Sequence, residues 1–117
     1  MSRAWLFQAN PEKYDIIETL KLGEELWNLR QHASAVNVGD QVLIWVCGPD
    51  AGIYAVGTVV TPPVTRADSP EGITHWRTPE EGRRPKPRVL VRYDRVLDKP
   101  LRKVYLQNDP NLWNMKI

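Results

Sequence analysis

One tryptophan of this chain, Trp76, stands between a histidine and an arginine, and more cations follow it closely. An aromatic ring can stack on a nucleobase, and Lys and Arg side chains pair with phosphates. We therefore expect this stretch to contact a nucleic acid. Five basic side chains are predicted to lie around one mouth of the domain and to contact the phosphate backbone: Arg77, Arg83, Arg84, Lys86 and Arg88.

The charge of the chain is unevenly distributed along its length. Residues 1–60 contain four Lys and Arg against seven Asp and Glu, a balance of −3, whereas residues 61–117 contain twelve against seven, a balance of +5. A basic half on a chain whose net charge is only +2 indicates a surface for a polyanion. On charge alone, a solvated face without a partner explains the same pattern, and this alternative stays open.

Catalytic motifs are absent from the sequence. It contains no G-x-S-x-G, no phosphate-binding loop and no Cys/His pair at a useful spacing. A metal site is not supported, because Cys47, His32 and His75 lie far apart and there is no second cysteine. Neither histidine has a visible acid–base partner. We therefore expect a protein that is not an enzyme and that has neither metal nor cofactor.

The length of 117 residues is enough for one domain and too short for two. No apolar run reaches the length of a membrane-spanning helix, and the N-terminus lacks the pattern of a signal peptide. The single cysteine cannot form an internal disulfide, which suits the cytoplasm. We expect one cytoplasmic domain without a membrane partner.

Two β-strands joined by a tight loop are predicted for residues 41–47 and 53–60. Apolar residues occupy both alternating sets of the first strand, which predicts burial on both faces and places Cys47 in the core. The sequence GPDAG between the strands is typical of a turn. Gly57, inside the second strand, indicates a bulge or a close approach by another group. We expect an antiparallel hairpin at the centre of the fold.

The segments before this hairpin are predicted to form a strand and a helix. Residues 3–9 alternate weakly, as in a strand. Asn10 followed by proline is typical of a helix start, so we expect a helix from Pro11 to Lys21 that ends near Gly23. Residues 24–32 are ambiguous between helix and strand.

The second half contains a long connection and two further strands. Residues 61–87 hold six prolines and two glycines, which predicts an irregular loop with a functional role. Residues 88–97 and 101–106 are typical of strands, and Trp113 is an expected anchor of the tail. The order of elements predicts an α+β fold: a mixed β-barrel or strongly curved sheet with short helices at its rim.

Several motifs together resemble the EVE domain, which has a PUA-like fold and is related to the YTH domain. They are WLFQANPEKYDI, ELWNLRQ and GDQVLIWVCGPDAGIYAVGTVV, followed by RVLVRYDRVL and LDKPLRKVYLQNDP, and they cover essentially the whole chain. EVE domains usually continue into a Gly-Thr-Asn-like stretch and a closing helix, whereas this chain stops at Ile117. We therefore expect a short variant or the N-terminal part of a longer protein.

The resemblance implies a non-catalytic reader of a modified cytosine or adenine, in DNA rather than RNA. YTH domains hold N6-methyladenine in an aromatic cage, and EVE domains are implicated in reading modified DNA bases in bacterial or archaeal defence. A fused or associated nuclease or ATPase effector is the implied partner. Carried over by position, Trp27 matches the first cage tryptophan, Trp76 the second cage aromatic, and Asp15 a polar residue near the base edge.

The chemistry of a flipped base agrees with this assignment. Aromatic faces replace its lost stacking, at about 1–3 kcal/mol per base, and polar groups meet its Watson–Crick edge. A cage residue of this kind is expected to contribute little to the core. Ordinary structural roles stay open for these residues, as do three other functions: an RNA-binding PUA-like module, a small-ligand domain and a protein-interaction domain. The expected base-binding residues are Trp27, Trp76, Asp15, Tyr14, Asn10 and Asn28, the last through nearby backbone groups.

Overall fold

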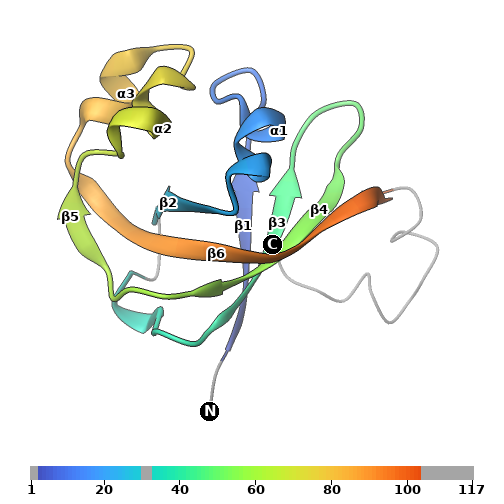
Figure 1. The fold of residues 1–117 in the computed structure, drawn as a ribbon, viewed down its shortest axis with the longest axis horizontal. Coiled ribbons are helices and arrows are strands. Elements are labelled where there is room, and N and C mark those ends of the chain that lie inside the picture. The colour runs from blue at the N-terminus through green and yellow to red at the C-terminus, as the bar shows by residue number, and fades with distance from the viewer. Residues whose placement is uncertain (1–2, 30–32, 104–117) are drawn as a thin grey trace.

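The computed structural model describes residues 3–29 and 33–103. They form six strands and several short helices, and no helix of this part is long and apolar enough to cross a membrane. In chain order (Figure 1) the elements are β1 (Ala4–Ala9), α1 (Ile16–Thr19), a 3₁₀ helix (Leu20–Leu22), β2 (Glu24–Asn28), a 3₁₀ helix (Ala33–Ala35), β3 (Gln41–Val46), β4 (Gly52–Val59), β5 (Val64–Arg66), α2 (Pro70–Thr74), α3 (Pro79–Arg83) and β6 (Lys86–Arg102).

The strands form one mixed sheet. Its order is β1-β3-β4-β6-β2, and β5 pairs with β6 outside this path. Only β1 and β3 run parallel among the described pairs, and the other pairs are antiparallel. The long strand β6 bends across the molecule and pairs with β2, β4 and β5 (Figure 1). The sheet is strongly curled into a half-barrel with short helices, which confirms the predicted fold class.

The predicted central hairpin is confirmed, since β3 and β4 pair antiparallel. Gly48, in the loop between them, has a φ of +116°, which favours glycine. At Gly57 the register of β4 against β6 shifts, and a Cβ atom there would lie 2.7 Å from the backbone oxygen of Arg92. Gly57 therefore marks both a bulge and a close approach by another strand.

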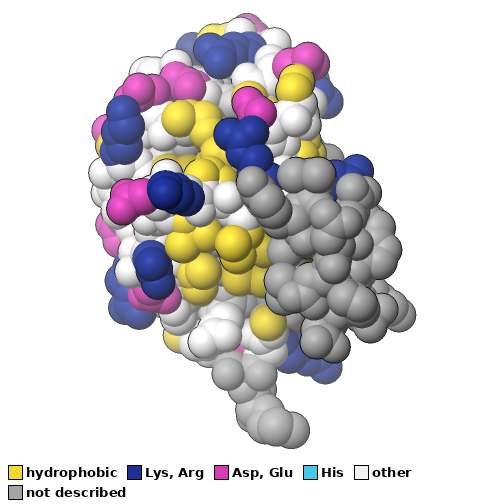
Figure 2. All heavy atoms as spheres, turned by 90° about the vertical axis from the view of Figure 1, so that its right-hand side faces the viewer, with side chains coloured by type: hydrophobic (Ala, Val, Ile, Leu, Met, Phe, Trp, Pro, Cys, Tyr) yellow, Lys and Arg dark blue, Asp and Glu magenta, His cyan; other side chains and the backbone are white. Residues whose placement is uncertain are grey.

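The two faces of β3 pack into separate hydrophobic clusters, which explains why both are apolar. Val42 and Ile44 belong to the main core, whereas Trp45 packs with Ile53 on the opposite face. Hydrophobic side chains gather among charged ones on the side of the molecule where β3, β4 and the end of β6 lie (Figure 2). Cys47 is only half-buried against the second cluster, because it follows the end of β3, so its predicted place in the core is wrong.

The predicted helix starts at Ile16 instead of Pro11. Asn10 does begin a turn: its side-chain oxygen accepts from the backbone N–H of Glu12 at 3.0 Å. The turn is not continued, because Tyr14 forms an isolated antiparallel bridge with Trp76. A pairing with a distant segment therefore overrides the local helix signal, and Asn10 does not cap α1.

The ambiguous segment after Gly23 is a strand. Gly23 has a φ of +84° and ends the 3₁₀ helix Leu20–Leu22, close to the predicted helix end. Residues 24–28 then form β2, which pairs antiparallel with β6. Residues 30–32, which include His32, lie outside the described part of the chain.

The connection over residues 61–87 is not the irregular loop that its composition predicted. It contains β5, α2 and α3. Pro70 and Pro79 stand in the first turns of the two helices, where proline is favoured because the first N–H groups need no intrahelical partner. Ser69 caps α2 by accepting from the backbone N–H of Gly72 at 3.0 Å. The prolines therefore begin elements here instead of breaking them.

The two strands predicted after this connection are one continuous strand, β6, up to Arg102. The pairing of β6 with β4 is irregular between Val96 and Leu101, and Pro100 lies in this interval. A proline without an N–H is tolerated at such an irregularity, because no ladder hydrogen bond is lost. The end of the predicted second strand and Trp113 lie outside the described residues.

Candidate functional site

Alternate residues of β2 point into the half-barrel. Glu25 and Trp27 are more than nine-tenths buried, whereas their neighbours on the strand are more exposed. The Trp27 ring packs against Phe7, with 5.9 Å between ring centroids. Its Nε1 donates a hydrogen bond of 2.8 Å to the hydroxyl of Tyr93 on β6. The indole is therefore part of the core and is held in one orientation.

The Glu25 carboxylate is the centre of a buried hydrogen-bond network. Oε2 accepts from the Tyr14 hydroxyl at 2.8 Å, and Oε1 accepts from Thr19 at 3.1 Å and from the Tyr93 hydroxyl. Burial raises the pKa of Glu25 although the three hydrogen bonds favour its charged form. Burial beside this carboxylate also raises the pKa of Tyr14 and Tyr93 far above the usual value. Both tyrosines are therefore neutral donors.

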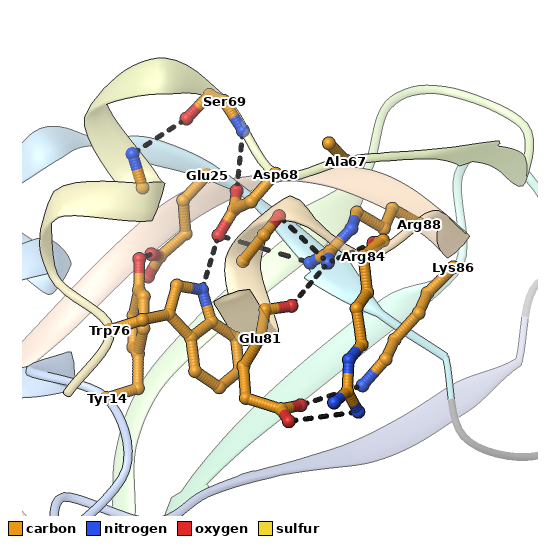
Figure 3. A network of polar contacts seen from close by, with 12 residues as sticks. Tyr14, Glu25, Ala67, Asp68, Ser69, Trp76, Glu81, Arg84, Lys86 and Arg88 are labelled. Atoms are coloured by element: carbon orange, nitrogen blue, oxygen red, sulfur yellow. Dashed lines mark hydrogen bonds and ion pairs between the residues drawn. The ribbon is translucent and has the colours of Figure 1, made fainter. Parts of the chain in front are cut away.

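Trp76 is held from three sides between α2 and α3. Its ring lies 4.9 Å from that of Tyr14, centroid to centroid, at 60°. Its Nε1 donates to Oδ2 of Asp68 at 2.8 Å (Figure 3). A Cβ atom on Gly82 would lie 2.7 Å from Cδ1 of the indole, so only glycine leaves room there. Trp76 is thus anchored by its neighbours, which agrees with the structural role that the sequence left open for it.

Asp68 joins this anchor to a buried arginine. Besides Trp76, it accepts from the backbone N–H of Ser69 at 2.8 Å, and Nη1 of Arg88 lies 4.0 Å from its Oδ2. The guanidinium of Arg88 also donates to main-chain carbonyls around it, as Figure 3 shows in part. These belong to Arg66, Glu81, Gly82 and Arg84. Arg88 therefore ties β6 to β5 and to α3.

These side chains surround a cavity of about 50 Å³. Its wall comes from the end of β1, the following turn, β2, the residues flanking α2 and the start of β6. Exposed Gln8 and Lys13 lie at its rim, and buried Tyr14, Glu25 and Trp27 form its interior. The full set of lining residues is Gln8, Ala9, Asn10, Lys13, Tyr14, Glu25, Leu26, Trp27, Asn28, Asp68, Trp76 and Arg88.

The fold brings five of the predicted base-binding residues to this cavity: Trp27, Trp76, Tyr14, Asn10 and Asn28. Asp15 does not line it. Tyr14 and Asp15 directly precede α1, and Tyr14 is the one that is buried. The Asp15 carboxylate lies 4.0 Å from Nδ1 of His75. His75 thus has a carboxylate neighbour that the sequence did not reveal.

The predicted basic surface is corrected at Arg88. Its side chain is 1% exposed, and its donors are directed at main-chain carbonyls and Asp68, so it does not face a phosphate. On β6, Arg88 lies between Asn28 of β2 and Val64 of β5, and its side chain is buried there.

The other predicted cations lie at the surface, but acidic side chains accompany most of them. Arg84 pairs with Glu81 at 3.1 Å, and Lys86 pairs with the same carboxylate at 3.4 Å. Arg83 lies 4.0 Å from Glu80. These pairs neutralise part of the positive charge of the predicted basic surface.

Arg77 is placed differently, next to the cavity. Its backbone N–H donates to the carbonyl of Lys13 at 2.8 Å, and its Nη2 donates to the carbonyl of Pro11 at 3.3 Å. Two exposed cations are therefore joined through their main chains: Lys13, at the rim, and Arg77, which follows the cavity residue Trp76.

Sequence reasoning missed several residues of the cavity, above all Glu25, Asp68 and Lys13. The signal for Glu25 was its position two residues before Trp27, because alternate residues of a strand share a face. For Asp68, no local signal exists, since its side-chain partners Trp76 and Arg88 lie beyond α2 and on β6.

The sequence matches the EVE domain family over residues 3–117, and no curated protein matches it. Among solved structures, the fold is similar to a hypothetical protein from Leishmania major, with a TM-score of 0.69, 19% identity, and coverage of 98% of this chain and 79% of that chain. A Pseudomonas putida protein has a TM-score of 0.64 at 21% identity, covering 94% of this chain and 80% of its own.

Human THYN1, solved in complex with DNA that contains 5-methylcytosine, also has this fold. Its TM-score is 0.62 at 17% identity, with coverage of 92% of this chain and 74% of that chain. At these identities the similarity shows the fold alone. The family match spans nearly the whole sequence, as the motifs in both halves predicted, and the chain therefore belongs to the EVE domain family.

Proposed function

We propose that this EVE domain binds one modified base, flipped out of DNA into the cavity between Trp27 and Trp76. One observation carries the proposal: a single cavity collects two indoles, a tyrosine and two asparagines from distant parts of the chain. A flipped base needs flat apolar faces and a few polar groups for its edge. That human THYN1 has been solved with DNA containing 5-methylcytosine supports DNA and a methylated cytosine as the first ligand to test.

The two indoles suit stacking because their polar atoms are already used. Nε1 of Trp27 is bound to Tyr93, and Nε1 of Trp76 is bound to Asp68. Only carbon faces therefore remain for a ligand. Rings that are fixed before binding lose little rotational freedom on binding, which favours affinity. Asn10 and Asn28 supply amide groups near the base edge in this proposal.

The phosphates on either side of the flipped base are assigned to the rim of the cavity. Lys13 and Arg77 are exposed, adjacent and next to the cavity. They are the first candidates for phosphate contacts, because a flipped nucleotide keeps its backbone at the surface. Arg83, Arg84 and Lys86 are secondary candidates, because each lies beside Glu80 or Glu81.

The proposed activity is binding without turnover, as expected for a reader. A fused or associated nuclease or ATPase effector and a cytoplasmic location stay predictions. RNA is the alternative nucleic acid, and the 2′-hydroxyl would be its distinguishing contact.

The test is a titration of labelled DNA oligonucleotides that differ only in one 5-methylcytosine. We expect tighter binding to the methylated strand, with the oligonucleotide recovered unchanged. Trp76→Phe should weaken that binding, because it shrinks the wall of the cavity. Trp45→Phe is the matched control, since Trp45 lies in the second cluster and outside the cavity. Equal affinity for both strands contradicts modified-base reading, and no binding to any DNA or RNA strand contradicts nucleic-acid binding altogether.

A further inference from the structure

The buried carboxylate of Glu25 lies two residues before Trp27, the proposed stacking residue, on β2. Glu25 and Trp27 are on the same inward face of β2, and both line the cavity. Two residues along a strand span roughly 6.8 Å, about the width of a nucleobase. A ring that stacks on Trp27 therefore has one of its edges directed at Glu25.

The hydrogen-bond inventory shows what that edge must offer. A carboxylate accepts at about four positions and donates none. In the described part of the chain, Oε1 of Glu25 accepts from Thr19 and Tyr93, whereas Oε2 accepts only from Tyr14. One acceptor position on Oε2 is therefore left for a ligand. A second carboxylate, Asp68, also lines the cavity and is buried. The cavity therefore has two buried carboxylates and one buried guanidinium, that of Arg88.

We propose, resting on the function proposed above, that Glu25 accepts a hydrogen bond from the exocyclic amino group of the bound base. The site then takes cytosine- or adenine-type bases and disfavours thymine and uracil, whose matching position is a carbonyl oxygen. A carbonyl facing the carboxylate leaves two buried acceptors without a donor, and sites built for a hydrogen-bond donor reject such analogues strongly. Burial raises the pKa of Glu25, and an amino donor offsets this effect by stabilising the carboxylate.

The experiment compares single-stranded DNA oligonucleotides that carry either 5-methylcytosine or thymine at one central position. The two bases share ring size and methyl group, and single strands need no unpairing. We expect wild-type protein to bind the thymine strand about tenfold or more weakly, the scale of one specific base contact. A third strand, with 5-methyl-2-pyrimidinone, lacks the amino group without adding a carbonyl and should also bind more weakly than 5-methylcytosine.

Two variants of β2 assign the effect. Glu25→Gln should lose the preference for 5-methylcytosine over thymine, because its amide can donate to a carbonyl. Glu24→Gln removes an exposed neighbouring carboxylate and should keep the preference. Equal wild-type binding of all three strands overturns the inference while leaving the proposed function intact. Binding of none of them, nor of any other modified strand, overturns the proposed function. The wild-type comparison decides the question even if Glu25→Gln fails to fold.

Discussion

The indole of Trp27 on β2 donates a hydrogen bond of 2.8 Å to the hydroxyl of Tyr93 on β6, and that hydroxyl donates in turn to Glu25. The wall of the cavity and the hydrophobic core therefore share one side chain. The expectation that a cage residue contributes little to the core is wrong for Trp27, which is 9% exposed and packs in the main cluster.

Trp27→Ala should lower the free energy of unfolding by about 3–5 kcal/mol, the range for truncating a buried large aromatic residue. Urea denaturation measures this loss. Tyr93→Phe should cost about 1–3 kcal/mol, because it leaves the indole nitrogen without its partner. A Trp27→Ala variant as stable as the wild type would place the indole outside the core.

Arg88→Ala should destabilise the domain by about 3–5 kcal/mol, because it leaves the buried Asp68 carboxylate without its cation and removes the donor of several main-chain carbonyls. Arg83→Ala is the matched control, since the Arg83 side chain is 64% exposed. Its change should stay within about 0.5 kcal/mol. Equal losses for both variants in denaturant titrations would show that burial of Arg88 contributes nothing.

Gly82→Ala should displace the Trp76 indole, because the new methyl group would lie 2.7 Å from its Cδ1. We expect a loss of about 1–3 kcal/mol of stability, as for overpacking, together with weaker binding of the methylated oligonucleotide. Glu80→Ala, on the exposed surface of the same helix, should change neither. Unaltered melting and binding in Gly82→Ala would mean that the indole can move freely.

Glu25→Gln should change the pH dependence of stability in a defined direction. The pKa of Glu25 is raised in the folded state, so the folded protein binds more protons than the unfolded chain between the two pKa values. The contribution of Glu25 to stability is therefore largest below the ordinary pKa of glutamate and falls as pH rises through the folded pKa. Denaturation across acidic to neutral pH should show this decline in the wild type minus variant difference. A difference that grows with pH would reverse the assigned sign.

Lys13→Ala and Arg77→Ala should each weaken oligonucleotide binding evenly across sequences, because phosphate contacts carry no base information. Each should also reduce the slope of log affinity against log salt by about 1. Arg95→Ala is the control, because Arg95 is an exposed cation where β6 pairs with β4. Should Arg95→Ala lower the slope as much as the two rim variants, phosphates would not be bound at the rim specifically.

Local sequence patterns were enough to predict the central hairpin, the first strand and the family. The period-two pattern around GPDAG and the glycines at 48 and 57 are local signals, and the hairpin, the turn and the close strand contact in the structure agree with them. The sequence also pointed to Trp27 and Trp76, which the fold does bring to one cavity.

The roles of the remaining residues depend on contacts between distant parts of the chain. The helix start moved to Ile16 because Tyr14 pairs with Trp76, a partner far along the chain. Arg88 belongs to a run of cations in the sequence, yet the curl of β6 turns it inward to Asp68. Glu25 is the polar centre of the cavity, whereas in the sequence it is not distinguished from the other acidic residues. Pairing between distant strands sets which face each side chain takes, and no local pattern contains that information.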